Sequence, residues 1–219
     1  MIEGTFIVVE GVDGAGTTTH TRLLVNALRD QGLPAHATRE PSDGPVGVLL
    51  RQILTGRVVV PGALRGGRPP SWGTMALLFA ADRLDHLEAE VVPNLMDGVT
   101  VVSDRYDHSS VAYQSLTGGG DASAVQWVMD LNRHARRPDL TIILDIPPEV
   151  AARRRLDRAR GREMYDDEKL QAELTGFYTE IDRHFPGDRV VHVPADRPID
   201  SVAADVLREV RILRGDPVQ

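Results

Sequence analysis

FIVVEGVDGAGTTT (residues 6–19) is the stretch that decides the fold. An apolar run at residues 5–9 leads into a glycine-rich turn, and residues 18–31 then show the periodicity of a helix. Residues 11–18 fit the phosphate-loop pattern G-x-x-x-x-G-K-[ST] at every fixed position except that of the lysine. Glycines allow backbone N–H groups to point at phosphate oxygens, and the positive end of the helix adds to the attraction. The alternative interpretation is a plain glycine turn that caps a helix.

Thr17 stands where the pattern has its lysine. That lysine normally reaches the β- and γ-phosphates and neutralises charge there, which a short, neutral threonine cannot do. Lys169 is the only lysine among the 25 basic residues, so a replacement cation should be an arginine. Thr18 keeps the hydroxyl that usually binds Mg²⁺. The loop therefore predicts a site for phosphoryl compounds whose cation comes from another part of the chain.

The composition is that of an ordinary globular protein, with 42% hydrophobic and 26% charged residues in a chain of 219. We expect one domain over residues 1–214 and a frayed tail at residues 215–219. A net charge of −7 argues against binding to nucleic acid polymers. The sequence contains no cysteine, no leader-like segment and no run long enough for a membrane span, so we expect a cytoplasmic protein without membrane contacts.

Short apolar runs alternate with helical patterns along the chain. The runs that read as strands are residues 5–9, 35–38, 99–102, 140–146 and 189–193. The helical patterns cover residues 18–31, 46–54, 74–95 with a break near Pro93, 122–134, a segment beginning at Pro148, and 199–213. This alternation predicts an α/β fold whose ligands bind at the carboxyl ends of parallel strands. Residues 56–73, rich in Gly, Pro and Arg, read as a loop. One interpretation is that this loop reshapes the site or the edge of a dimer. The other is that it is a tolerated surface insertion.

Four further motifs occur in order along the chain. They are TREPSDG (38–44), LFAADR (78–83), DRYDHSSVAYQ (104–114) and RRRLDRARGREMYD (153–166). Together with EGVDG (10–14), they closely resemble the thymidylate kinase family, whose members phosphorylate dTMP to dTDP with ATP. The resemblance covers residues 5–178. It implies a P-loop nucleoside-monophosphate-kinase fold with a parallel five-stranded sheet flanked by helices and a small lid, a homodimer, Mg²⁺ as cofactor, and a place in nucleotide biosynthesis.

The resemblance also implies a role for individual residues. Phe79 would stack on the thymine base, and Arg83 would bond its carbonyl. Arg39 and Arg105 would clamp the acceptor phosphate, and Tyr113 would crowd the sugar 2′ position. The full set implied for dTMP is Asp13, Arg39, Glu40, Phe79, Arg83, Arg105, Ser109, Ser110, Tyr113 and Gln114.

The nucleotide donor and the metal have their own implied residues. The set implied for ATP is Gly11, Val12, Asp13, Gly14, Ala15, Gly16, Thr17, Thr18 and Thr19. Asp13 would lie near the sugar 3′-hydroxyl and the transferring phosphate. Thr18 and Asp104 would hold Mg²⁺, which binds through few protein ligands and keeps its waters.

Each of these residues also has a simpler interpretation. Phe79 and Tyr113 could be core residues, and Arg83 could pair with Glu88 on its own helix. Asp104 and Arg105 could form a surface ion pair of little energetic weight. The histidines His20, His108 and His134 lack metal-site spacing and read as surface or capping groups.

Residues 153–162 contain six arginines, and the resemblance places this run in a lid over ATP, at about residues 153–166. Family members whose phosphate loop lacks an arginine use lid arginines in catalysis. The implied catalytic set is Asp13, Arg105, Arg153, Arg158, Arg160 and Arg162. In a helix, Arg154, Arg158 and Arg162 would share one face. The alternative is a solvated basic face.

Two other functions remain open at this stage. A kinase for another deoxynucleotide or for a deoxynucleoside would share most of these motifs. A catalytically impaired nucleotide-binding homologue is supported only by the missing lysine at Thr17.

Overall fold

The computed structural model describes residues 3–61, 67–157 and 164–216. Its central sheet has five parallel strands in the order β2-β5-β1-β6-β7. They are β1 (Phe6–Glu10), β2 (Ala35–Arg39), β5 (Thr100–Asp104), β6 (Leu140–Asp145) and β7 (Val190–Pro194). The expected α/β fold and parallel five-stranded sheet are therefore confirmed.

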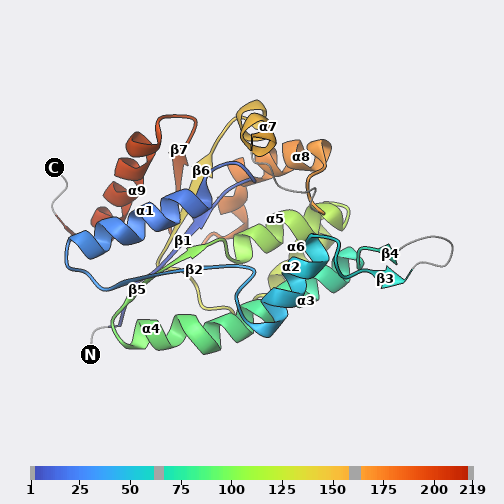
Figure 1. Ribbon diagram of the computed structural model, residues 1–219, viewed down its shortest axis with the longest axis horizontal. Helices are drawn as coiled ribbons and strands as arrows, with labels where there is room; N and C mark the ends of the chain where they lie inside the picture. Colours follow the sequence, from blue (N-terminus) through green and yellow to red (C-terminus); the bar gives the residue numbers. More distant parts are fainter. Residues whose placement is uncertain (1–2, 62–66, 158–163, 217–219) are drawn as a thin grey trace.

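Helices connect the strands and cover the sheet (Figure 1). They are α1 (Thr17–Asp30), α2 (Pro45–Leu54), α3 (Trp72–His86), η1 (Leu87–Val91), α4 (Val92–Met96), α5 (Asp107–Thr117), α6 (Ala122–Leu131), α7 (Pro148–Leu156), α8 (Glu168–Thr179), η2 (Ile181–His184) and α9 (Ile199–Arg214). Helices α1 and α9 lie side by side on one side of the sheet, whereas α3 and α4 lie on the other. No helix within the described ranges is both long and apolar enough to cross a bilayer.

Two expectations about irregular segments need correction. The stretch expected to break near Pro93 stays helical from α3 into α4, and its irregularity is the π-helical turn η1 immediately before α4. The segment expected to be a loop at residues 56–73 contains an antiparallel pair, β3 (Val60–Pro61) and β4 (Gly67–Arg68), and the first residues of α3. Of the expected tail, Gly215 ends α9 in the left-handed conformation.

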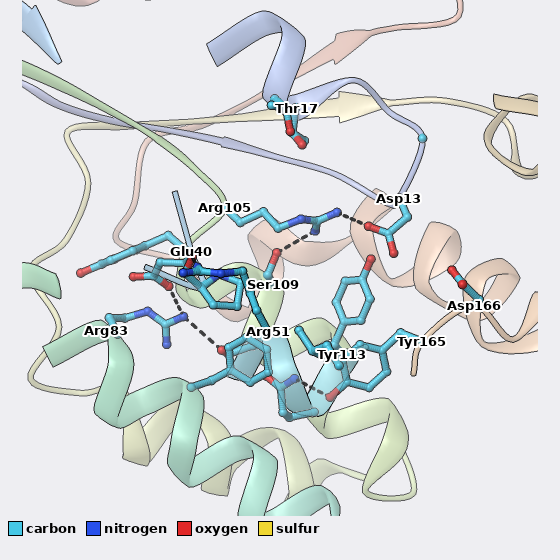
Figure 2. Close-up of a pocket in the computed structure, with 18 of the residues that line it drawn as sticks. Asp13, Thr17, Glu40, Arg51, Arg83, Arg105, Ser109, Tyr113, Tyr165 and Asp166 are labelled. Carbon is cyan, nitrogen blue, oxygen red and sulfur yellow. Dashed lines mark hydrogen bonds and ion pairs between the residues drawn. The ribbon is translucent and has the colours of Figure 1, made fainter. Parts of the chain in front are cut away.

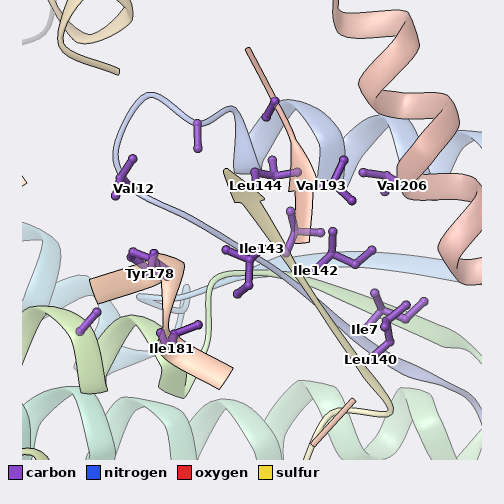
Figure 3. Packing of buried hydrophobic residues seen from close by; sticks show 14 of the residues in the cluster. Ile7, Val12, Leu140, Ile142, Ile143, Leu144, Tyr178, Ile181, Val193 and Val206 are labelled. Atoms are coloured by element: carbon purple, nitrogen blue, oxygen red, sulfur yellow. The ribbon is translucent and has the colours of Figure 1, made fainter. Parts of the chain in front are cut away.

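Both faces of the sheet are buried. Ile7 and Val9 pack with Ile142 and Val206 in the larger core, part of which Figure 3 shows, while Phe6 and Val8 belong to a second core with other residues. Continuous apolar strands of this kind are typical of parallel sheets covered by helices. The register pairs Val9 of β1 with Asp104 of β5, so the segments that follow these strands meet at one edge of the sheet.

Candidate active site

A pocket of 310 Å³ opens at the carboxyl ends of the central strands (Figure 2). Its wall consists of Asp13, Gly14, Gly16, Thr17, Thr18, Glu40, Pro41, Arg51, Leu54, Thr55, Phe79, Arg83, Arg105, Tyr106, Ser109, Ser110, Tyr113, Gln114, Tyr165 and Asp166. The volume is in the range of small-molecule sites. The pocket thus joins the phosphate loop to all four of the other motifs singled out in the sequence.

The phosphate loop has the backbone that its glycines predict. Gly14 and Gly16 have φ angles of 99° and 101°, in the left-handed region that favours glycine. A Cβ atom on Gly14 would lie 2.7 Å from the carbonyl oxygen of Ala151 on α7. Thr17 begins α1, and the first N–H groups of a helix have no partner within it, so they are free to bind an anion.

Arg105 connects the loop to the start of α5. It is a non-glycine residue with φ of 74°, a conformation found mainly where the surroundings or the function demand it. Its Nη2 donates to Asp13 Oδ1 at 2.6 Å, and its Nη1 donates to Ser109 Oγ at 2.9 Å. The alternative of a local Asp104–Arg105 ion pair is therefore wrong, because the partner of Arg105 lies on the phosphate loop.

Glu10 orders this region. It belongs to the EGVDG motif, but the sequence predicted no role for it. Glu10 is fully buried at the end of β1. Its Oε1 accepts from the backbone N–H groups of Tyr106 and Ser109, at 2.8 and 3.0 Å. Its Oε2 accepts from the hydroxyls of Ser109 and Tyr178, at 2.7 and 2.9 Å. Burial and the Glu10 charge together raise the pKa of Tyr178, so its phenol stays protonated and donates.

A buried ion pair lies at the opposite end of the pocket. Arg83 Nη2 donates to Glu40 Oε2 at 2.5 Å and to Ser110 Oγ at 3.1 Å, and Nη1 donates to Asn132. The side chains of Arg83 and Glu40 are 1% and 3% exposed. The alternative pairing of Arg83 with Glu88 is therefore wrong. The guanidinium also lies over the ring of Tyr106.

Aromatic and amide side chains form the wall between these two ends. Phe79 is half-buried, lining the pocket while packing against the core. The rings of Tyr113 and Tyr165 lie 5.3 Å apart, and Gln114 Nε2 donates to the Tyr165 hydroxyl at 3.4 Å. Burial raises the pKa of Tyr165 to about 12, so this phenol is uncharged at neutral pH. Tyr165 was not among the predicted site residues, although its motif was.

Some predicted residues do not line the pocket. Arg39 is exposed and pairs with Asp43 at 2.8 Å, which holds its side chain by the loop that follows β2. Arg51 of α2 lines the pocket instead, and it donates to the carbonyl oxygen of Pro41 at 2.8 Å. Four of the loop residues assigned to ATP also lie outside the wall: Gly11, Val12, Ala15 and Thr19.

Thr18 and Asp104, the expected metal residues, are in direct contact. The Thr18 hydroxyl donates to Asp104 Oδ2 at 2.5 Å. Asp104 Oδ1 is buried and has no hydrogen-bond partner in the described part of the chain. The described residues contain no group of three or more His, Asp or Glu side chains that could enclose a metal ion. A hydroxyl beside a carboxylate with a spare oxygen fits Mg²⁺ that keeps most of its waters.

The arginine run begins on α7, against the phosphate loop. Arg154 donates to the carbonyl oxygens of Gly14 and Ala195, at 3.4 and 3.0 Å, and Arg155 donates to that of Asp13 at 2.9 Å. Arg153 is exposed. Of the other predicted catalytic arginines, Arg158, Arg160 and Arg162 lie outside the described residues.

The expectation for the histidines was wrong in two of three cases. His134 is exposed, but His20 and His108 are buried. His108 stacks on the ring of Phe185 with centroids 3.9 Å apart, which gives it an aromatic environment that its polar neighbours in the sequence do not suggest.

A parallel sheet with a phosphate loop after its central strand, and with arginines in the adjoining pocket, defines a P-loop nucleoside-monophosphate-kinase type of protein. The family model for thymidylate kinase matches residues 9–206. The chain is 39% identical over 215 residues to a protein named "Probable thymidylate kinase" from Thermococcus gammatolerans, covering 97% of this chain and 99% of the relative. It is 36% identical over 213 residues to a "Thymidylate kinase" from Dinoroseobacter shibae, covering 95% and 97%. The chain belongs to the thymidylate kinase family.

The buried Arg83–Glu40 pair generates a prediction about stability. Replacing Glu40 with Leu leaves a buried guanidinium without its counter-charge, which should lower the free energy of unfolding by about 3–5 kcal/mol. Urea unfolding followed by circular dichroism measures this loss. Arg183→Ala is the control, because it breaks an exposed pair with Glu180 and should cost less than about 1 kcal/mol. Equal losses of unfolding free energy in the two variants would contradict the assignment of Arg83 and Glu40 as a buried, stabilising ion pair.

Proposed function

We propose that this protein transfers the γ-phosphoryl group of ATP to dTMP, forming dTDP and ADP. The pocket that joins the phosphate loop to Phe79 and Arg83 is the observation that carries the proposal. In the reaction, an acceptor phosphate oxygen bonds to the γ-phosphorus as the bond to the β,γ-bridging oxygen breaks. Several negative charges meet during this step, so the protein must position the groups and neutralise charge.

The acceptor contacts follow from the order of residues along the pocket. Thymine stacks on Phe79 and receives a hydrogen bond from Arg83, with Gln114 as a further neighbour. Arg105 binds the acceptor phosphate together with Arg51, whose side chain lines the same pocket. Ser109, Ser110 and Glu40 act through the hydrogen bonds that hold these arginines. Arg39 joins the phosphate clamp only if its side chain leaves Asp43.

Mg²⁺ would be held by Thr18 and Asp104. The spare, buried Asp104 Oδ1 supports this, because a metal-bound water could donate to it. The ion supplies positive charge to the β- and γ-phosphates of ATP. Asp13 is fixed by Arg105 and would lie near the sugar 3′-hydroxyl and the transferring phosphate, and Tyr113, which lines the same pocket, would crowd the 2′ position.

Arginines of residues 153–162 supply the charge that Thr17 cannot. Arg154 and Arg155 already contact loop carbonyls, and they join Arg153, Arg158, Arg160 and Arg162 as candidates. A guanidinium suits phosphate oxygens because it can donate two parallel hydrogen bonds. We also propose a homodimer, supported by the exposed Leu77 and Leu84 on α3.

A panel of acceptors tests the proposed reaction. With ATP and Mg²⁺, ADP release should be fastest for dTMP, compared with dUMP, dCMP, dAMP and thymidine. Arg105→Met should lower kcat by roughly 10²–10³-fold, as expected for the loss of one preorganised charge stabiliser. A preference for another acceptor would contradict the assignment to dTMP. Calorimetric binding of dTMP and ATP without ADP release would favour the impaired homologue.

Substitutions in the loop and in the arginine run test the compensation. Arg155→Ala should lower kcat by about 10²-fold, and replacing at least one other arginine of residues 153–162 with Ala should do the same. Thr17→Lys should then raise kcat only slightly, because arginines already supply the positive charge. The exposed Lys169→Ala is a matched control for loss of a cation and should leave kcat unchanged. A wild type with ordinary turnover that tolerates every arginine substitution would refute the compensation, as would a gain of orders of magnitude in Thr17→Lys.

A further inference from the structure

His86 lies behind the Arg83 end of the pocket and does not line it. The ring is buried on α3, three residues after Arg83. Its Nε2 lies 2.7 Å from Thr38 Oγ1 and its Nδ1 lies 3.4 Å from Glu40 Oε1. None of the roles proposed above uses this histidine, yet it contacts the carboxylate that holds Arg83.

The contact with Glu40 assigns the proton on the ring. An ionised carboxylate only accepts hydrogen bonds, so Nδ1 must carry a hydrogen to face Glu40 Oε1. At Nε2, the Thr38 hydroxyl can accept from the cation while it donates to Glu90, or it can donate to the neutral ring instead. The same geometry therefore serves the neutral and the cationic forms of His86. In both forms, Oε1 is held by His86 and Oε2 is left to pair with Arg83.

Charged groups surround His86 on every element that packs against it. His36 lies in β2, and Glu40 directly follows that strand. Asp82 and Arg83 lie on α3, and Glu90 lies on η1. Asp43 lies further from the ring. Glu90 Oε2 lies 3.5 Å from the His86 Nε2, and Glu90 Oε1 lies 2.7 Å from His36. Burial alone would lower the pKa of His86, but Glu40, Glu90 and Asp82 outweigh it and raise the pKa above its ordinary value of 6.5.

We propose that His86 is a positioning residue for the acceptor base, setting both the orientation and the net charge of the Glu40–Arg83 pair. This inference rests on the proposed function. With His86 neutral, the Glu40 carboxylate neutralises Arg83 alone. With His86 cationic, two cations share that carboxylate, and Arg83 presents more positive charge to a carbonyl oxygen of the base. Binding of the base therefore weakens as the pH rises through the pKa of His86.

Thymidine is the probe that isolates this effect, because it carries no phosphate that titrates near neutral pH. Its Kd, measured by calorimetry from pH 6 to 9, should rise about tenfold in the wild type, as expected for one charge removed near a half-buried site. In His86→Gln, the amide N–H can still donate to Glu40, so binding should persist while its pH dependence disappears. In His86→Leu, Glu40 Oε1 loses its donor, and the Kd should rise about tenfold or more at every pH.

Steady-state kinetics separate positioning from general damage. His86→Leu should raise the KM for dTMP and leave the KM for ATP and kcat close to those of the wild type. His36→Gln is the matched control, because it removes the more exposed histidine of the same cluster and should keep the pH dependence. If His86→Gln does not fold, Glu90→Gln supplies the test, because removing the Glu90 charge 3.5 Å from Nε2 disfavours the cation and should move the midpoint to lower pH.

Each outcome decides the proposal. A thymidine Kd that does not depend on pH in the wild type would overturn it, as would the same pH profile in wild type and His86→Gln. Loss of the pH dependence in His36→Gln would assign the effect to His36 instead. A wild type that forms dTDP yet shows any of these results refutes only the role of His86. A wild type that neither forms dTDP nor binds thymidine refutes the proposed function, and this inference with it.

Discussion

The buried carboxylate of Glu10 is the interaction on which the geometry of the site depends. A charge removed from water is stable only if hydrogen bonds replace its hydration. Glu10 obtains them from the first turn of α5, through Tyr106 and Ser109, and from Tyr178 on α8. Because these donors must stay in place, the end of β1, the start of α5 and helix α8 are held in one arrangement around the pocket.

That arrangement continues through polar contacts to the phosphate loop. Ser109 donates to Glu10 and accepts from Arg105, and Arg105 donates to Asp13. The left-handed backbone of Arg105 is thus maintained by partners on both sides. The same logic applies at the other end of the pocket, where Glu40 is shared by Arg83 and His86. In both places a carboxylate fixes an arginine, which suits a reaction that depends on placing charge.

The sequence predicts the centre of the sheet well because β1 and β6 are nearly continuous apolar runs, and it predicts the loop because glycines at fixed spacing have a physical reason. It does not predict α5, whose residues are buried on nearly all sides and so lack the polar face that marks a helix. Arg51 and Tyr165 enter the pocket through tertiary packing that no local pattern records. Glu10 lies 99 residues from Ser109, so its role depends on a contact that spacing cannot reveal.

The most direct test of this account is the kcat/KM for dTMP of a Glu10→Gln variant, measured at pH 7 with saturating ATP and Mg²⁺. Glutamine keeps the volume, but when its oxygen faces the backbone N–H groups of Tyr106 and Ser109, its N–H₂ group faces the Ser109 and Tyr178 hydroxyls. These hydroxyls must then accept instead of donate, which should displace Arg105. The account predicts a loss of about 10²-fold in a variant that still folds, since small misplacements of catalytic groups have effects of this size. A folded variant with wild-type kcat/KM would contradict it.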